Sequence, residues 1–489
     1  MKIESIIGIQ HISNNKKINT SLIPTSRIDE INEASLYFHL MKIDGTERLP
    51  SFNQGLPAAI VCNEKSALAL DEVPIIRVKN ERLALSHALS EYYGLDYERL
   101  NIIGITGTNG KTSTARILEK IFEFAEHKVG YIGTGCIRIG NKQLSDKFYS
   151  MTTPDPDFLY KSLSVMQEEG CTEIIMEVSS HSIYLNKISP IRFKYGVFTN
   201  LSAEHMDLHK TMEEYLCTKE SLFKQCKKGV FNLDDPFSRK VYERCDIEKI
   251  STGIINKANY YITDYTTSPG EGSRFFLRGK NFICGVQLSL LGAVNVYNAL
   301  MASAIAIDHG IKPCIVKTAL KSLKTIKGRM ELIKDEINVI IDYAHTPRAL
   351  SNLLHFVLSD VILGQFLILV FGCGGNRDKY KRSAMGEIAE KYAKRIYLTE
   401  DNSRNESFDD ICASILPKRS SLTKWQIIKD RIEAITVAID NAPAGATVVI
   451  VGKGDEPYII DQDGYRDYSD RDTVENKLAE RRSRHAHKA

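Results

Sequence analysis

A glycine-rich segment that ends in Gly-Lys-Thr carries the clearest chemical signal in the chain. It runs from Gly104 to Ser113 as GITGTNGKTS, between an apolar run and an amphipathic stretch. Glycines let the backbone approach a ligand closely, so its N–H groups can bind phosphate oxygens, and a helix start adds partial positive charge. In such a loop Lys111 would reach the β- and γ-phosphates of a nucleotide, and the Thr112 hydroxyl would ligate magnesium. The first glycine lies one residue earlier than GxxxxGK[ST] requires, so this is a variant phosphate loop.

The alternative interpretation of this segment is a glycine-rich turn that only caps a helix. We favour nucleotide binding because the apolar run before the loop, the helical pattern after it and Gly-Lys-Thr at the junction occur together. The loop does not define the reaction, since kinases, GTPases, motors and ligases share loops of this kind.

Short apolar runs alternate with helix-length amphipathic stretches on both sides of the loop, which is typical of α/β domains. A strand is predicted over residues 102–105 and a helix over residues 112–126, whose apolar residues recur at the spacing of one buried face. Continuous apolar runs suit a sheet covered on both faces. Further strands are predicted over residues 58–61, 74–78, 173–178, 195–199, 338–342, 366–371, 395–398 and 447–451.

The expected fold class is therefore α/β with three domains, since a chain of 489 residues is long enough for about three. We expect a small N-terminal α/β domain over residues 1–97, a central phosphate-loop ATPase with a doubly wound sheet over residues 98–330, and a C-terminal Rossmann-like α/β domain over residues 331–489.

The composition gives no reason to expect nucleic-acid or membrane binding. Lys plus Arg exceed Asp plus Glu by 64 − 61 = 3. Ten cysteines are scattered without a CxxC pair, and neither a signal peptide nor a run of about 18 apolar residues is present. We expect free thiols and a cytoplasmic location. The basic run Arg481, Arg482, Arg484, His485, His487 and Lys488 is expected to be a frayed, solvated tail.

Beyond the phosphate loop, an ordered series of motifs resembles the Mur ligases, which build the peptide stem of peptidoglycan. Within that family the chain is most similar to ligases that add the third amino acid to UDP-N-acetylmuramoyl-L-alanyl-D-glutamate. The resemblance implies domains for the UDP-sugar, for ATP and for the incoming amino acid. It also implies that ATP phosphorylates the D-glutamate side-chain carboxylate before the amine attacks. The motifs are GTNGKTST, TTPDPD, MEVSSH, FTNLSAEHMDLH, TMEEYLCTKESLF, NVYNAL, GRME, DYAHTP, FGCGGNRDKYKR and GKGDE.

By this resemblance, a set of residues would bind ATP and magnesium and carry the catalysis. The implied catalytic residues are Lys111, Glu177, His205 and Lys219. The implied magnesium ligands are Thr112, Glu177, His205 and Lys219, the last one if carbon dioxide carbamylates it. The implied ATP-binding residues are Gly107, Thr108, Asn109, Gly110, Lys111, Thr112, Ser113, Asn295, Arg329 and Asp342.

Each of these roles has a plainer alternative. Glu177 could cap a turn, and His205 and Lys219 could lie on the surface. Asn295 and Asn298 open an apolar stretch and could cap its helix. His345, in the same motif as Asp342, could be purely structural.

The resemblance also implies the substrate contacts. The dipeptide-sugar would be bound by Ser26, Thr152, Thr153, Ser179 and Lys187. The amino acid would be bound by Arg377, Asp401, Asn402, Ser403, Arg404, Gly452 and Glu456. The chain departs from the family pattern at Thr25 for aspartate, Leu185 for glutamine, Lys187 for arginine, Ser403 for proline and Asp455 for histidine.

The segment DNSR, residues 401–404, indicates which amino acid is added. It resembles the DNPR motif of ligases that add meso-diaminopimelate. This substrate differs from L-lysine by a second carboxylate, and a guanidinium fork such as that of Arg404 is the best match for a carboxylate. The alternative is that Arg404 is a solvated loop arginine.

Three other functions stay open: an L-lysine-adding ligase of the same type, a ligase like folylpolyglutamate synthase, and an inactive nucleotide-gated regulatory protein. We expect a monomer that acts on small molecules.

Overall fold

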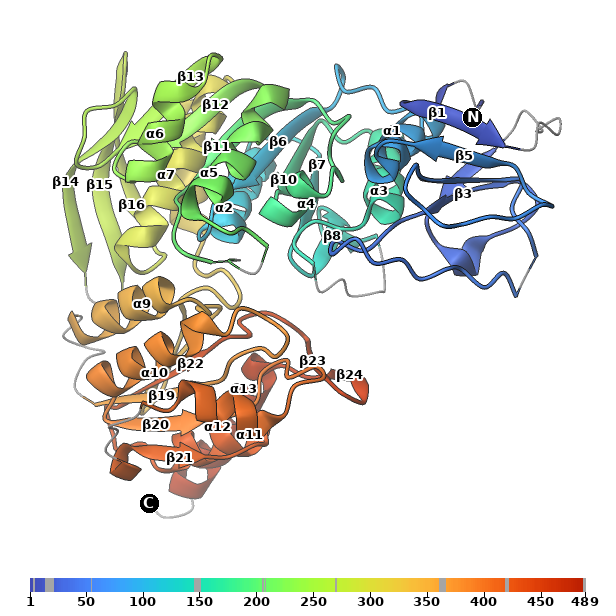
Figure 1. Ribbon diagram of the computed structural model, residues 1–489. Helices are drawn as coiled ribbons and strands as arrows, with labels where there is room; N and C mark the ends of the chain where they lie inside the picture. The colour runs from blue at the N-terminus through green and yellow to red at the C-terminus, as the bar shows by residue number, and fades with distance from the viewer. Residues whose placement is uncertain are drawn as a thin grey trace.

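Three mainly parallel β-sheets, each covered by helices, form the protein (Figure 1). The computed structural model describes residues 1–2, 5–13, 22–53, 55–144, 151–204, 206, 208–268, 271–359, 366–417 and 422–486. In Figure 1 the N-terminal sheet lies at the right of the large central sheet, and the C-terminal sheet lies below the central sheet. The expected α/β class is confirmed.

The N-terminal sheet has five strands in the order β1-β5-β4-β3-β2, and only β1 runs antiparallel to its neighbour. Helix α1 packs against it and begins after Asn80, whose side chain accepts a hydrogen bond from the Leu83 N–H. The elements are β1 (Ile9–Ser13), β2 (Ile23–Thr25), η2 (Ile28–Glu30), β3 (Ser35–His39), β4 (Ala59–Asn63), β5 (Ile75–Val78) and α1 (Glu81–Tyr92).

The central sheet has eleven strands in the order β16-β15-β14-β13-β12-β11-β6-β10-β7-β8-β9, and the strands from β14 to β7 are parallel. The strands are β6 (Asn101–Thr106), β7 (Val129–Gly133), β8 (Cys136–Ile139), β9 (Lys142–Gln143), β10 (Glu173–Glu177), β11 (Phe193–Phe198), β12 (Cys226–Asn232), β13 (Glu248–Gly253), β14 (Tyr260–Ser268), β15 (Gly272–Gly279) and β16 (Phe282–Leu288).

Helices cover both faces of this sheet, so neighbouring residues of one strand enter different cores. In β6, Ile102 packs into one apolar cluster, while Ile103 and Ile105 pack into the other with α2 and α7. This explains why the strand sequences are apolar without alternation. The helices are α2 (Lys111–Phe124), α3 (Pro156–Glu168), α4 (Ser180–Tyr184), α5 (Met212–Glu220), η3 (Ser221–Gln225), α6 (Pro236–Arg244), α7 (Ala293–Asp308) and α8 (Pro313–Ser322).

The C-terminal sheet has six strands in the order β17-β18-β22-β19-β20-β21, and only β17 is antiparallel to its neighbour. The elements are β17 (Glu331–Lys334), β18 (Asn338–Asp342), α9 (Pro347–Ser359), β19 (Leu367–Phe371), α10 (Tyr380–Tyr392), β20 (Arg395–Leu398), α11 (Phe408–Ile415), η4 (Leu422–Lys424), β21 (Trp425–Ile427), α12 (Arg431–Asp440), β22 (Thr447–Val451), the hairpin β23 (Tyr458–Asp461) and β24 (Gly464–Asp467), and α13 (Asp470–Ala486).

The strands that the sequence predicts in all three sheets are confirmed to within a residue or two. The expected frayed tail is wrong for Arg481, Arg482 and Arg484, which belong to α13. That helix buries Val474 and Leu478 against the C-terminal sheet. The guanidinium groups of the three arginines, Arg481, Arg482 and Arg484, form ion pairs with Glu336, Asp335 and Asp440, respectively. His487 and Lys488 lie outside the described residues, and among the described helices none is long and apolar enough to cross a bilayer.

Candidate active site

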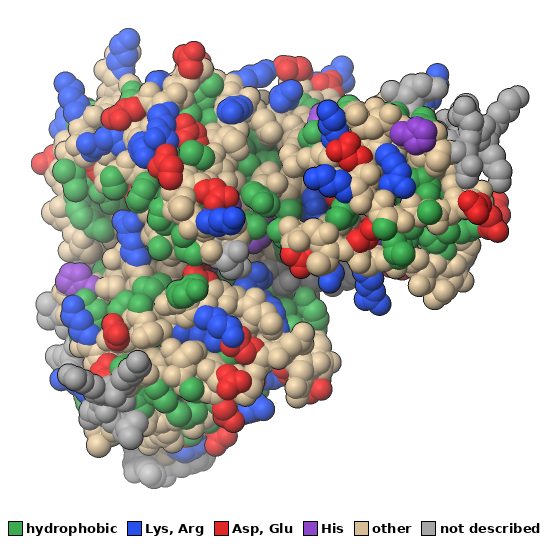
Figure 2. All heavy atoms as spheres, viewed as in Figure 1, with side chains coloured by type: hydrophobic (Ala, Val, Ile, Leu, Met, Phe, Trp, Pro, Cys, Tyr) green, Lys and Arg blue, Asp and Glu red, His purple; other side chains and the backbone are tan. Residues whose placement is uncertain are grey.

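A cleft of about 920 Å³ lies where loops of the central sheet face loops of the C-terminal sheet. In the space-filling view the surface is notched between the N-terminal part and the C-terminal part (Figure 2). The cleft brings together residues that are far apart in the sequence. The predicted site residues that line it are Thr108, Asn109, Gly110, Lys111, Thr112, Ser113, Thr152, Thr153, Glu177, Ser179, Lys187, Asn295, Arg329, Asp342, Arg377, Asp401, Asn402, Arg404, Gly452 and Glu456.

The phosphate loop links β6 to α2 and depends on its glycines. Gly107 has φ 142° and Gly110 has φ 87°, both positive values that residues with a side chain rarely adopt. A Cβ on Gly110 would lie 2.6 Å from Asn298 Oδ1, and one on Gly107 would overlap with Thr199 Oγ1. The loop therefore keeps its backbone open toward the cleft, with the positive end of α2 behind it.

Two lysines converge on the Gly107 carbonyl oxygen. Lys111 Nζ donates to it at 3.0 Å and to the Thr108 oxygen at 2.9 Å, while Lys219 Nζ donates to it at 3.2 Å. Lys219 is only 1% exposed, so the alternative of a surface lysine is wrong. Burial lowers the pKa of both amines, and the nearby Lys111 charge further lowers the pKa of Lys219, which is well below its usual value.

Glu177 ends β10 as a fully buried carboxylate beside the loop. It accepts hydrogen bonds from Thr112 Oγ1 at 3.0 Å and from the Tyr131 hydroxyl at 2.5 Å. The turn-cap alternative is wrong because its donors are side-chain hydroxyls. This carboxylate raises the Tyr131 pKa further than burial alone does, which keeps the phenol protonated as a donor. The carboxylate and the Thr112 hydroxyl are oxygen donors of the kind that magnesium prefers.

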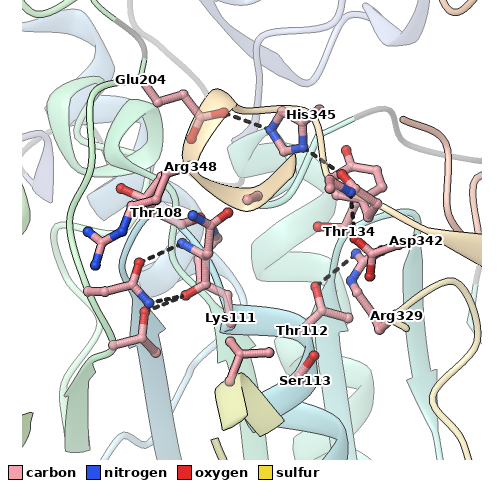
Figure 3. Close-up of a pocket in the computed structure, with 18 of the residues that line it drawn as sticks. Thr108, Lys111, Thr112, Ser113, Thr134, Glu204, Arg329, Asp342, His345 and Arg348 are labelled. Atoms are coloured by element: carbon pink, nitrogen blue, oxygen red, sulfur yellow. Dashed lines mark hydrogen bonds and ion pairs between the residues drawn. The ribbon is translucent and has the colours of Figure 1, made fainter. Parts of the chain in front are cut away.

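His205 lies outside the described residues. Its neighbour Glu204 is buried and accepts from His345 Nε2 at 2.7 Å, which connects the central part to the C-terminal part (Figure 3). His345 thus has a structural role at the edge of the cleft. Arg348 makes a second connection, donating to the Leu201 carbonyl oxygen at 3.1 Å.

Arg329 enters the cleft from the segment before β17. Its guanidinium lies 3.3 Å from Thr112 Oγ1, 3.4 Å from Asp455 and 4.2 Å from the centre of the Tyr343 ring (Figure 3). Asp342 does not pair directly with it. Both Asp342 oxygens accept backbone N–H groups, from Met330 at 2.7 Å and from Ala344 at 2.8 Å. Asp342 thereby fixes the segment that carries Arg329.

Asn295 and Asn298 lie inside α7, whose N-cap is Gly292, so the helix-cap alternative is wrong for both. Asn295 donates to the Leu291 oxygen at 2.9 Å, and Asn298 donates to Asn295 Oδ1 at 3.3 Å. These bonds hold two amides at the cleft end of the helix, beside Gly110.

The residues predicted to hold the dipeptide-sugar divide into two groups. Thr153 donates to the Glu177 carbonyl oxygen at 2.9 Å and accepts from the Ser179 N–H at 3.0 Å, so these residues adjoin the phosphate loop. Lys187 Nζ forms a 2.7 Å ion pair with Asp155. Ser26 is not among the residues that line the cleft. Its hydroxyl donates to Asp157 at 2.5 Å.

The residues predicted to bind the amino acid follow strands of the C-terminal sheet. Asn402 donates to Glu456 Oε2 at 3.0 Å, and Lys453 Nζ lies 3.1 Å from the same oxygen. Gly452 has φ 112°, and a Cβ there would lie 2.9 Å from Asp401 Oδ2. Ser403 is not among the residues that line the cleft.

Arg404 is held in a strained backbone conformation, with φ 53°. Its Nη1 donates to the Gly375 oxygen at 2.9 Å and to the Asn402 oxygen at 3.2 Å, so it is not a freely solvated loop arginine. Burial and the nearby charge of Arg377 lower its pKa. Two guanidinium groups close together at the wall of a cleft create a positive potential there.

Comparison with known proteins identifies this arrangement. Residues 105–306 match the Mur ligase middle domain, and residues 328–454 match the Mur ligase glutamate ligase domain. A relative from Aquifex aeolicus, named UDP-N-acetylmuramoyl-L-alanyl-D-glutamate–2,6-diaminopimelate ligase, is 40% identical over 79% of each chain. The chain belongs to the Mur ligase family. It is accordingly an ATP-dependent ligase.

Other proteins similar to this Mur ligase have the same name as the Aquifex aeolicus relative or share its fold. One of the same name from Chlorobaculum tepidum is 36% identical over 86% of this chain and 85% of its own length. A solved structure of a ligase with this name has a TM-score of 0.62 and 26% identity over 95% of this chain and 96% of its own. Folylpolyglutamate synthase from Mycobacterium tuberculosis shares the fold, with a TM-score of 0.63 and 18% identity over 76% of this chain and 92% of its own.

Several residues in or beside the cleft of this Mur ligase escape prediction from the sequence. Tyr131 and Thr134 approach Glu177 but carry no signal in the sequence. Glu204 directly precedes His205, and Tyr343 directly follows Asp342, so their motifs could have indicated them.

Proposed function

We propose that this Mur ligase joins meso-diaminopimelate to the D-glutamate of UDP-N-acetylmuramoyl-L-alanyl-D-glutamate, with conversion of ATP to ADP and phosphate. The observation that carries the proposal is a single cleft lined by both the phosphate loop and the paired guanidinium groups of Arg377 and Arg404. The names of the relatives support it. We place the reaction in a cytoplasmic monomer with the three domains 1–97, 98–330 and 331–489.

In the first step, the D-glutamate carboxylate attacks the γ-phosphorus of ATP, and ADP leaves. The loop from Gly107 to Ser113 binds the phosphates, while Asn295 contacts the adenine. Lys111 and Arg329 stabilise the negative charge that moves onto the transferred group, and Asp342 positions Arg329.

In the second step, the amine of the amino acid attacks the acyl carbon, and phosphate leaves. Thr152, Thr153, Ser179 and Lys187 hold the muramoyl dipeptide close to the phosphate loop. Ser26 contributes from the UDP side, where its bond to Asp157 fixes the start of α3.

The diaminopimelate lies on the C-terminal side of the cleft. Its distal carboxylate pairs with Arg404 and Arg377, because a guanidinium fork matches two carboxylate oxygens. Its distal ammonium is bound by Asp401, Asn402 and Glu456, with Ser403 and Gly452 shaping the loops. L-lysine lacks the carboxylate and would leave the two arginines without an anion.

We also propose that Lys219 is carbamylated. The reaction needs a neutral amine, which attacks carbon dioxide and loses a proton. A pKa well below the usual value favours that neutral amine. The product is an anion beside Lys111, which replaces repulsion by attraction.

Magnesium would be held by oxygens of Thr112, Glu177 and the Lys219 carbamate, together with His205, and would neutralise phosphate charge. These donors suit a hard cation. The conversion of Lys219 to an anion supplies the second carboxylate-like group of the site.

A phosphate-release assay tests the function. Release from ATP should require UDP-N-acetylmuramoyl-L-alanyl-D-glutamate and meso-diaminopimelate together. A reduced folate with glutamate should give no release, which separates this ligase from a folylpolyglutamate synthase. Absence of phosphate release with every substrate pair would indicate the inactive regulatory protein and contradict the proposal.

A further inference from the structure

A histidine–carboxylate cluster lies at the end of the central sheet remote from the phosphate loop. His127 Nδ1 is 3.2 Å from Glu173 Oε1, and His309 Nε2 is 3.1 Å from the same oxygen. One donor atom from each residue lies within 4.8 Å of the other two. Glu173 begins β10 and Glu177 ends it, so the cluster and the nucleotide site are separated by roughly 13 Å at ~3.3 Å per residue.

The Glu173 carboxylate is buried without a full set of partners. Its side chain is 1% exposed, and no lysine or arginine of the described chain pairs with it. Oε1 also accepts from Asn101 Nδ2 at 3.1 Å, whereas Oε2 has no hydrogen-bond partner among the described residues. Buried carboxylates are usually paired or coordinate metals, and an unsatisfied buried oxygen calls for an explanation such as an ion.

We propose that His127, Glu173 and His309 form a binding site for a divalent transition metal of the zinc class. Two imidazole nitrogens and one carboxylate oxygen are a zinc donor set with one position left for water. Neighbouring ligands around tetrahedral zinc lie about 3.3 Å apart for bonds of about 2.0–2.1 Å. The observed nitrogen–oxygen distances of 3.2 and 3.1 Å match this spacing. Nitrogen donors also separate this site from magnesium, which prefers oxygen.

The metal can enter from one side and would be shielded on the other. The His127 side chain is 28% exposed and that of His309 is 8% exposed, so solvent reaches the cluster past His127. Phe122 packs against both rings, at 5.4 Å from His127 and 5.3 Å from His309 between ring centres. This wall orients the two imidazoles toward Glu173.

The site would join the far ends of three elements that build the nucleotide site. His127 lies between α2 and β7, Glu173 starts β10, and His309 directly follows α7. The other ends of α2, β10 and α7 carry the phosphate loop, Glu177 and Asn295, respectively. A bound zinc ion would therefore stabilise the frame of the ATPase part and take no part in the reaction. The plainer account of the cluster is that two neutral imidazoles donate N–H groups to the carboxylate.

Cobalt binding distinguishes the two accounts, independently of ligase activity. The full-length protein is stripped with a chelator and dialysed, and excess Mg²⁺ with ADP is added to saturate the oxygen-rich nucleotide site. Co²⁺ is then titrated while visible absorption is recorded. We expect one Co²⁺ per chain that Zn²⁺ displaces and further Mg²⁺ does not. Zn²⁺ should also raise the melting temperature.

Variants locate the site. Glu173→Gln and His309→Gln should weaken Co²⁺ binding at least ~100-fold, since even residues that only orient ligands alter affinity by 10–100-fold. His87→Gln, which alters another half-buried histidine, is the matched control and should bind as the unmodified protein does. If the Glu173→Gln and His309→Gln variants fail to fold, the His127→Gln variant tests the site in their place. The His127 side chain is partly exposed, so its replacement should disturb folding less. Absence of Co²⁺ absorption in the unmodified protein, or equal binding by His127→Gln, would overturn the proposal.

Discussion

Replacing Arg404 by alanine should selectively weaken binding of diaminopimelate. The guanidinium group lines the cleft and is anchored by the Gly375 and Asn402 carbonyl oxygens. A hydrogen bond to a charged group contributes about 1.5–3 kcal/mol. At 1.4 kcal/mol per factor of ten, Arg404→Ala should raise the KM for diaminopimelate about 10–150-fold. The KM for ATP should stay within about twofold, because the residues expected to contact the phosphates lie on other elements.

Two further variants make this test specific. Arg404→Lys keeps the charge and loses the fork, so its KM should lie between those of Arg404→Ala and the unmodified protein. Arg395→Ala removes an exposed arginine from the same sheet and should change neither KM. The KM values come from initial rates of phosphate release. An unchanged KM for diaminopimelate in Arg404→Ala, or an equal rise for ATP, would refute the assignment.

Three other substitutions test the ATP side. Lys111→Ala should lower kcat at least ~100-fold, about 3 kcal/mol in the barrier, and near-normal ligation would contradict its role. Lys219→Ala should be similarly inactive and partly rescued by formate or acetate. A ¹³C carbamate signal should appear with ¹³C-bicarbonate only when Lys219 is present, and an active Lys219→Ala would exclude the carbamate. Gly110→Ala places a Cβ 2.6 Å from Asn298 Oδ1 and should raise the KM for ATP about tenfold or more. Gly135→Ala is its control, because that glycine also has positive φ but has nothing within 4 Å of the added Cβ. Equal KM values for ATP in the Gly110→Ala and Gly135→Ala variants would disprove the argument that Asn298 excludes a side chain at position 110.

The elements that the sequence predicts best are the strands buried on both faces. β18, β20 and β22 have the predicted bounds, because their apolar runs end at polar turns. The phosphate loop is equally clear, since Gly107 and Gly110 have positive φ values that few other residues adopt. Local patterns of this kind depend on nearby residues and can be recognised without knowledge of the packing.

Long-range contacts could not be derived in this way. The burial of Lys219 depends on how α5 packs beside the phosphate loop, and nothing in its own helix indicates it. The bond between Ser26 and Asp157 joins residues 131 positions apart. The ion pair between Glu204 and His345 similarly depends on the relative placement of two sheets. The predicted domain boundaries and site roles remain predictions.

A competition assay tests the central claim most directly. The unmodified ligase is given ATP, UDP-N-acetylmuramoyl-L-alanyl-D-glutamate and equal concentrations of meso-diaminopimelate and L-lysine, and the two tripeptide products are separated by mass. A cleft that holds the distal carboxylate with Arg404 and Arg377 should favour the diaminopimelate product by ~10³ or more, because unpaired recognition groups are costly. Comparable amounts of the two products would contradict this account of the cleft.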